Sequence, residues 1–182
     1  PVLLTGAALF VLASTAAALS SSAWAFVGFR VLQALGASAT LVALFATVRD
    51  VYADRPEGVV IYSLFSSILA FVPALGPIAG ALIARAGGWQ AIFLSLAGMG
   101  LLAWIHALLR WQETRPAKPM QSQQSALAVF KSPAFWVYTL GFSTGMGTFF
   151  VYFSTAPRVL IGQADYSEMS FSLAFASVAL VM

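Results

Sequence analysis

The chain has 182 residues, of which 60% are hydrophobic and 8% are charged, and its mean hydropathy is +0.89. Soluble domains carry about 25% charged residues, so this composition excludes a soluble globular protein. The formal net charge of +3 does not indicate nucleic-acid binding, because Lys and Arg lie mainly at the ends of apolar runs and form no cluster. The absence of Cys excludes disulfides and thiolate chemistry.

Apolar segments follow one another along the chain, and each is a candidate transmembrane helix. Their approximate ranges are 2–19, 23–48, 59–83, 89–111, 134–157 and 169–182. The last is too short for a complete span, and the first begins without Met. We therefore expect an all-α integral membrane protein with about six transmembrane helices, and we interpret the sequence as an internal fragment of a longer chain.

The connections between these segments differ in positive charge, which predicts an orientation in the membrane. One side carries Arg49, Arg55, Arg110, Arg115, Lys118 and Lys131, and the other carries Arg85 and Arg158. The positive-inside rule places the first side in the cytoplasm. On that side, residues 112–133 are polar and contain proline, which predicts a flexible cytoplasmic linker between two membrane halves, 1–111 and 134–182.

Arg30 lies inside the second apolar segment, and Gln33 follows one turn later on the same helix face. Arginine near the middle of a bilayer costs about 2.5–3.5 kcal/mol on insertion scales. Two interpretations are open. Arg30 is a buried cation that faces a water-filled path or an acidic partner, or its side chain extends to the outer headgroups.

The third segment carries Pro73, Gly76, Pro77 and Gly80 at its centre. In a helix in water, each interior Pro costs roughly 3 kcal/mol and each Gly about 1 kcal/mol. In a membrane, neighbouring helices satisfy the freed backbone groups, and glycines let two helix backbones approach closely. We predict a kinked, tightly packed transmembrane helix, and the family resemblance given below implies that these residues form a hinge and a seal.

The fifth segment is rich in aromatic residues and glycine, and we predict that part of it lines a cavity. The candidate cavity residues are Tyr138, Phe142, Ser143, Gly145 and Phe149. Aromatic rings beside hydroxyl groups would suit a neutral aromatic compound that itself carries hydroxyl groups. The alternative is a lipid-facing helix with an aromatic belt at the interface.

Two further patterns have both a functional and a plain structural interpretation. Residues 141–145 match the nucleophile-elbow pattern G-x-S-x-G, and His106 is the chain's single His. That motif requires a strand-to-helix turn, so an intramembrane Ser143/His106 hydrolase is a remote alternative. We expect no catalytic residues, no metal site and no cofactor. Asp50, at the end of the second segment, is either a solvated turn residue or a cytoplasmic gate.

Several of these motifs resemble those of the major facilitator drug:proton antiporters. Residues 30–36 (RVLQALG) resemble the fourth-helix signature Arg-x-x-Gln-Gly, with Ala34 where the family often has Gly. Residues 76–81 (GPIAGA) resemble the fifth-helix motif Gly-Pro-x-x-Gly-Gly, with Ala81 in place of the final Gly. Within that superfamily, the chain looks like the chloramphenicol/florfenicol exporters at residues 49–58, 71–78, 132–138 and 149–158.

The resemblance implies a fold and a function. The segments would be helices three to eight of twelve, so that 1–111 holds the last four helices of the N-terminal six-helix half and 134–182 the first helices of the C-terminal half. The function would be proton-coupled efflux of chloramphenicol-type antibiotics across the bacterial inner membrane. Arg30 would influence the protonation of an acid elsewhere, and the full-length protein would be a monomer. A major facilitator transporter of another small solute is the alternative.

Overall fold

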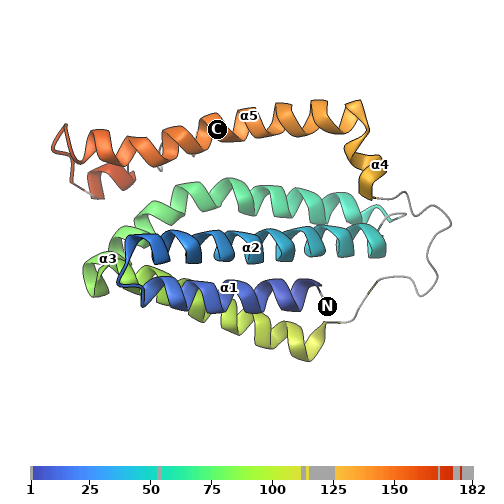
Figure 1. The fold of residues 1–182 in the computed structure, drawn as a ribbon, viewed down its shortest axis with the longest axis horizontal. Helices are drawn as coiled ribbons and strands as arrows, with labels where there is room; N and C mark the ends of the chain where they lie inside the picture. Colours follow the sequence, from blue (N-terminus) through green and yellow to red (C-terminus); the bar gives the residue numbers. More distant parts are fainter. Residues whose placement is uncertain are drawn as a thin grey trace. The chain divides into compact units, whose positions relative to one another are not determined.

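The computed structural model describes residues 2–52, 55–111, 114, 126–167, 169–173 and 177. Their regular secondary structure is helical, as the composition predicted, and Figure 1 shows its order along the chain. The helices are α1 (Val2–Ala18), α2 (Ala23–Tyr52), α3 (Glu57–Arg110), α4 (Ala126–Phe130) and α5 (Pro133–Leu160). The first three belong to one compact unit, and α4 and α5 belong to another.

α3 consists of two helical arms joined by a reversal at two glycines. Gly87 has φ −143° and ψ 17°, and Gly88 has φ 74° and ψ 179°, a backbone conformation that essentially only glycine adopts. The first arm (57–86) and the second arm (89–110) therefore run in opposite directions, as Figure 1 shows. The arms correspond to the third and fourth apolar segments, so the predicted loop at 85–88 is reduced to the glycine pair.

The two prolines of the first arm do not interrupt its helical backbone. The φ and ψ angles of α3 leave the helical range at Gly87 and Gly88, not at Pro73 or Pro77. Each proline removes one N–H, whereas the reversal needs a positive φ that only glycine tolerates easily. The prolines are therefore compatible with one continuous helical arm, and the chain turns at the glycine pair instead.

α1 contributes more buried residues than any other described helix of the first unit. Its buried residues are Leu3, Gly6, Ala13, Ser14, Ala17 and Ala18. On one side it contacts the second arm of α3, where Trp104 Nε1 donates a hydrogen bond to the Leu4 carbonyl at 3.0 Å. Further along the same interface, Gly100 lies against the ring of Phe10. α1 therefore contacts α2 and the second arm of α3 at the same time.

On its other side, α1 crosses α2 at two glycines. A Cβ atom built on Gly36 would lie 2.6 Å from the backbone nitrogen of Phe10 and 2.7 Å from the Gly6 carbonyl oxygen. A Cβ built on Gly6 would lie 2.9 Å from the Gly36 carbonyl oxygen. Neither position has room for a side chain, so the two helix backbones are in direct contact here. Small residues at such crossings are typical of membrane helices, which associate mainly by close packing.

The second unit begins with the short helix α4 and a turn, which lead into α5. Ser132 is the N-cap residue of α5 and Pro133 opens the helix, but the Ser132 side chain makes no capping hydrogen bond. Trp136 Nε1 donates to the Phe130 carbonyl at 2.8 Å and so ties the turn together. The end of the predicted linker is therefore ordered at 126–133, and its residues 112–113 and 115–125 lie outside the described part of the chain.

Two stretches of described helix are long and apolar enough to cross a membrane, Ala23–Tyr52 and Leu75–Arg110. The second of these includes the reversal at Gly87 and Gly88. Shorter apolar helices cover Val2–Ala18 and Glu57–Leu69. The sixth predicted segment is helical at 169–173 and at 177, and its other residues lie outside the described ones.

The crossing of α1 and α2 makes a prediction about stability. We expect Gly36→Ala to lower the free energy of unfolding by about 1–3 kcal/mol, because the new methyl group has no space. Gly28→Ala on the same helix is the matched control, since a Cβ there meets no described atom within 4 Å. We expect it to raise stability by up to about 1 kcal/mol through helix propensity. Tryptophan fluorescence during thermal unfolding in detergent measures both variants, and equal midpoints would contradict the crossing.

Candidate functional site

Arg30 and Gln33, which the sequence singled out, are part of a directed chain of hydrogen bonds between α2 and α1. Arg30 Nη1 donates to Gln33 Oε1. Gln33 Nε2 donates to Ser14 Oγ at 2.6 Å, and Ser14 Oγ donates to the Phe10 carbonyl at 2.6 Å. We call Arg30, Gln33, Ser14 and the Phe10 carbonyl the polar chain. Every donor in it points in the same direction, from the guanidinium of α2 to the backbone of α1.

The polar chain is buried at its centre. Ser14 is 0% exposed and Gln33 is 3% exposed, whereas Arg30 is exposed in the described part of the chain. A buried amide is costly unless both its ends are hydrogen-bonded, and both ends of Gln33 are. The reverse orientation of this amide would turn its NH₂ group toward the donors of Arg30, so the two partners together determine how Gln33 lies.

The guanidinium of Arg30 also contacts an aromatic ring of the second arm of α3. Its Cζ lies 5.4 Å from the centre of the Phe93 ring, within the range of a cation–π interaction. Phe93 meets Phe26 edge to face at 5.3 Å, and Trp89 meets Phe26 in the same way at 5.6 Å. We call Phe26, Trp89 and Phe93 the aromatic cluster. Arg30 is thus held by an amide from its own helix and by a ring from another.

No carboxylate of the described residues pairs with Arg30. The ion pair found in that part of the chain joins Arg49 and Asp50 at the other end of α2. Among the described residues, the partners of Arg30 are therefore the amide of Gln33 and the ring of Phe93.

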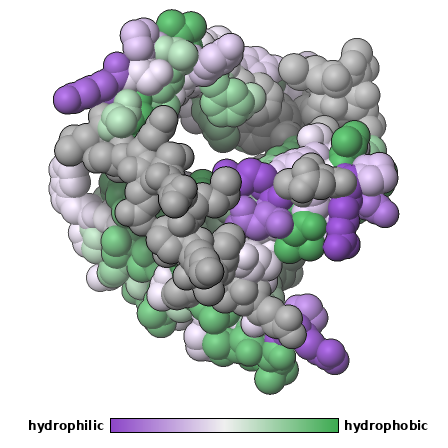
Figure 2. All heavy atoms as spheres, turned by 90° about the vertical axis from the view of Figure 1, so that its right-hand side faces the viewer, coloured by the Kyte–Doolittle hydropathy of each residue, from purple (hydrophilic) through white to green (hydrophobic). Residues whose placement is uncertain are grey.

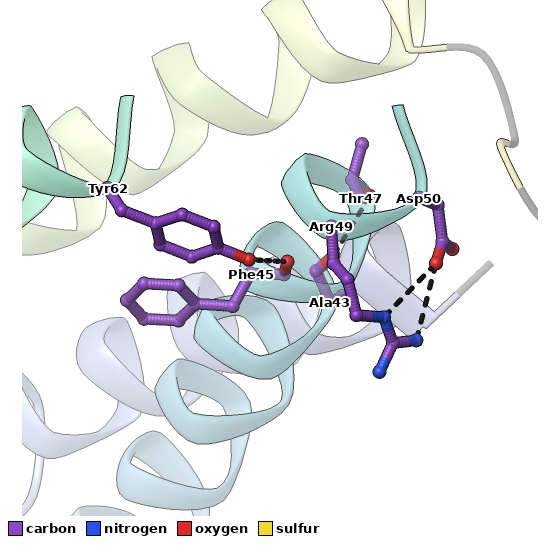
Figure 3. Close-up of polar contacts among 6 residues, drawn as sticks. All are labelled: Ala43, Phe45, Thr47, Arg49, Asp50 and Tyr62. Atoms are coloured by element: carbon purple, nitrogen blue, oxygen red, sulfur yellow. Dashed lines mark hydrogen bonds and ion pairs between the residues drawn. The ribbon is translucent and has the colours of Figure 1, made fainter. Parts of the chain in front are cut away.

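The end of α2 that contains the predicted gate residue Asp50 is drawn in Figure 3. Arg49 Nη2 lies 3.3 Å from Asp50 Oδ1, a contact between neighbours on one helix. The link to α3 comes instead from Tyr62, whose hydroxyl donates to the Phe45 carbonyl at 3.2 Å. The rings of Tyr62 and Phe45 stack at 5.9 Å, and Phe65 meets Phe45 edge to face. In this structure Asp50 is thus held by its own helix, and its role as a gate stays a prediction.

Charged residues of the first unit gather at this same end. α2 ends here with Arg49 and Asp50, the first arm of α3 begins with Glu57, and the second arm ends with Arg110. Figure 2 views this end and shows hydrophilic side chains among hydrophobic ones. Arg85 lies two residues before the reversal, at the far end of the two arms of α3. The orientation of these two ends in the membrane stays a prediction.

The predicted hinge and seal lies in the first arm of α3. A Cβ built on Gly76 or Gly80 would meet no described atom within 4 Å, so the close packing predicted for this face is not made among the described residues. The side chain of Pro73 lies outside them. The sealing role of Gly76 and Gly80 therefore stays a prediction.

The predicted cavity residues lie on α5, where the described side chains are exposed. Tyr138 is 79% exposed and Phe142 is 70% exposed, and Ser143 and Gly145 are exposed as well. The side chain of Phe149 lies outside the described residues. Residues 141–145 are inside the helix rather than at a strand-to-helix turn, so this segment lacks the geometry of a nucleophile elbow.

Sequence reasoning missed Ser14 and Phe93, the residues that connect Arg30 and Gln33 to other helices. Ser14 is one of three hydroxyl residues of α1, and the sequence does not distinguish it from Thr5 and Thr15. Phe93 is one of the chain's 15 phenylalanines. Only the packing of the helices distinguishes them, because their partners are 19 and 63 positions away along the chain.

Comparison with known proteins places these features in a family. The family model described as Major Facilitator Superfamily matches residues 1–182. The chain is 50% identical over 184 residues to a protein of Pseudomonas aeruginosa named chloramphenicol resistance protein, a match that covers 100% of this chain and 44% of that protein. No solved structure matches the chain.

More distant relatives carry the name multidrug resistance protein MdtL. The protein from Shigella dysenteriae serotype 1 is 39% identical over 125 residues, which is 69% of this chain and 32% of that protein. The protein from Escherichia coli O17:K52:H18 is 39% identical over 124 residues, which is 68% of this chain and 32% of that protein. The chain thus spans less than half the length of these relatives. It belongs to the major facilitator superfamily of membrane transporters.

Proposed function

We propose that this protein exports chloramphenicol-type antibiotics across the bacterial inner membrane in exchange for protons, and so confers resistance. The observation that carries the proposal is the 50% identity, over the whole of this chain, to a protein named for chloramphenicol resistance. The polar chain supports it, because a transporter coupled to protons needs a charge held in a defined place inside the membrane.

The proposed mechanism is alternating access, in which two halves of the transporter rock around a site near the middle of the membrane. One proton that moves inward gains about 2.3 kcal/mol per 100 mV of membrane potential. A tenfold concentration gradient costs about 1.4 kcal/mol, so one proton can drive a drug gradient of more than tenfold. The drug is moved without any covalent change, so the protein has no need of a catalytic residue or a cofactor.

In this mechanism Arg30 and Gln33 take part in proton coupling. A fixed cation near a carboxyl favours its deprotonated form, and moving that cation away favours protonation. Arg30 suits this role because its charge is permanent and because Gln33 and Phe93 hold the guanidinium on two sides. The helices around Arg30 do not provide this carboxyl, because α1, residues 23–48 of α2 and residues 89–105 of α3 contain no Asp or Glu. The carboxyl would therefore come from another part of the transporter.

The other site residues take roles that follow from their positions. Tyr138, Phe142, Ser143, Gly145 and Phe149 of α5 form one wall of the drug cavity, facing the partner helices of the assembled transporter. The exposure of the described side chains in this set supports a surface that another element covers.

The remaining roles that we propose concern the helix interfaces and the cytoplasmic end of the transporter. The glycine face of the first arm of α3, with Pro73 and Pro77, seals the closed side against proton leak. Asp50 acts as a cytoplasmic gate, the linker 112–133 is cytoplasmic, and the full-length protein works as a monomer. The concentration of positive charge at the Asp50 end supports this orientation.

A broader substrate range is the second candidate function. The MdtL proteins that match about two thirds of this chain are named for multidrug resistance rather than for one antibiotic. A cavity wall made of aromatic rings binds flat apolar compounds of many kinds. Competition of other antibiotics with chloramphenicol efflux would separate a broad exporter from a selective one.

Drug accumulation in cells tests the main proposal. We expect a susceptible bacterium that expresses the natural gene product to accumulate less labelled chloramphenicol, and an uncoupler to restore accumulation by removing the proton gradient. Arg30→Ala is expected to reduce efflux to near background, and Arg30→Lys to retain part of it, because an ammonium lacks the planar fork of the guanidinium. Unchanged accumulation on expression would reject the exporter, and full efflux by Arg30→Ala would reject the role of Arg30.

The glycine face of α3 makes a separate prediction. We expect Gly76→Leu to abolish efflux while membrane insertion stays normal, because the larger side chain keeps a partner helix away from this face. Gly98→Leu is the matched control, since a Cβ at Gly98 also meets no described atom within 4 Å. Resistance assays and the amount of protein in the membrane measure both variants. Normal resistance in Gly76→Leu cells would overturn the sealing role.

A further inference from the structure

We propose that Ser14 of α1 is a positioning residue for Arg30 and acts through Gln33. The inference rests on the proposed role of Arg30 in proton-coupled efflux. Its basis is the polar chain, in which the buried Ser14 hydroxyl accepts a hydrogen bond from Gln33 Nε2 at 2.6 Å. Through it, α1 determines where the guanidinium on α2 is held, although α1 itself carries no charged residue.

The hydrogen bonds of the Ser14 hydroxyl allow one orientation of the Gln33 amide. A hydroxyl has one donor and two acceptor positions. The donor of Ser14 goes to the Phe10 carbonyl, so the side of the oxygen that faces Gln33 can only accept. Gln33 must therefore present its NH₂ group to Ser14 and its oxygen to Arg30. If the hydroxyl is lost, the NH₂ group of Gln33 loses its partner on α1, so the amide and the guanidinium bound to it are no longer held in one place.

The position of Ser14 opposite Gln33 follows from the crossing of the two helices. α1 and α2 are antiparallel and touch at Gly6 and Gly36, and one turn beyond Gly36 in the direction of Arg30 lies Gln33. Direct backbone contact at the glycines brings the two helices close enough for a short side-chain hydrogen bond. The glycine crossing and the polar chain are thus two parts of one interface.

A serine in an apolar helix often has a purely local role, and the neighbouring residue provides the comparison. Thr15 Oγ1 donates to the Val11 carbonyl at 3.0 Å, the same type of bond that Ser14 makes to Phe10. Ser14 differs because it also accepts a bond from another helix. Thr15→Val therefore removes a hydroxyl from α1 without touching the polar chain, and it is the matched control for Ser14→Ala.

The first test measures Arg30 directly and does not depend on transport. The natural gene product and its variants are treated in membranes with phenylglyoxal, which modifies arginine, and the modification of Arg30 is followed by mass spectrometry. We expect Ser14→Ala and Gln33→Leu to raise the rate of modification about three- to tenfold, because the guanidinium loses its fixed partner. Thr15→Val should react like the parent protein. A parental rate in Ser14→Ala overturns the inference, whether or not the protein exports chloramphenicol.

The second test asks whether Ser14 acts through Gln33 during efflux. We expect Ser14→Ala to shift the pH profile of chloramphenicol efflux in the same direction as Gln33→Leu. α1 and residues 89–105 of α3 contain no ionisable side chain, so Arg30 is the one charged group at this interface among residues 2–48 and 89–105. The double variant should match Gln33→Leu alone, since residues of one hydrogen-bond chain are not additive. The positioning role is overturned if the double variant loses efflux by the sum of the two single losses. It is also overturned if Ser14→Ala keeps the pH profile of the parent protein.

The two tests separate the inference from the function on which it rests. If the parent protein does not export chloramphenicol, the proposed function fails and the reactivity of Arg30 alone decides the role of Ser14. If Ser14→Ala does not accumulate in the membrane, Ser14→Cys takes its place, because a thiol keeps the volume but is a weak hydrogen-bonding group. Residues 1–182 contain no Cys, so the labelling of a thiol at position 14, followed by mass spectrometry, also reports whether this position stays buried.

Discussion

The structure depends on the direct contact between the backbones of α1 and α2 at Gly6 and Gly36. A Cβ on Gly36 would lie 2.6 Å from the Phe10 nitrogen, so any other residue there forces the helices apart. In a lipid environment the hydrophobic effect does not drive helices together, and close packing with interhelical hydrogen bonds must do so. This crossing allows both. The rest of the first unit is arranged around α1, which packs on the second arm of α3 with its other side.

The crossing connects the packing of the helices with the chemistry of the site. Because the backbones touch, Ser14 reaches Gln33, and because Gln33 is held at one end, its other end is fixed against Arg30. The second arm of α3 completes the arrangement with Phe93. An arginine inside an apolar helix is costly, and each of these contacts offsets part of that cost. The same contacts also hold the charge of Arg30 in one place. A charge affects the protonation of a carboxyl only when the distance between them is defined.

The chain belongs to the major facilitator superfamily, so its local features are interpreted as parts of a membrane transporter. The first unit presents a polar chain on α1 and α2 and an open glycine face on α3, and the second presents exposed aromatic residues on α5. The centre of the polar chain is buried within the first unit, whereas the described aromatic side chains of α5 are exposed. In the proposed exporter, the arginine serves proton coupling, the glycine face serves sealing, and the aromatic face serves drug binding, so the three tasks fall on different helices.

The sequence by itself determined the fold class, the helical segments and the charged end, because these depend on local composition: apolar runs of helical length and the distribution of Lys and Arg along the chain. It also pointed to Arg30 and Gln33, since an ionisable residue in an apolar run is conspicuous wherever it packs. It predicted a kinked helix at Pro73 and Pro77, and the structure adds that the chain reverses at Gly87 and Gly88, where Gly88 has a positive φ. Only the tertiary structure decided the partners of Arg30. Ser14 and Phe93 resemble many other residues of the chain, and they acquire a role only because helix packing brings them to α2.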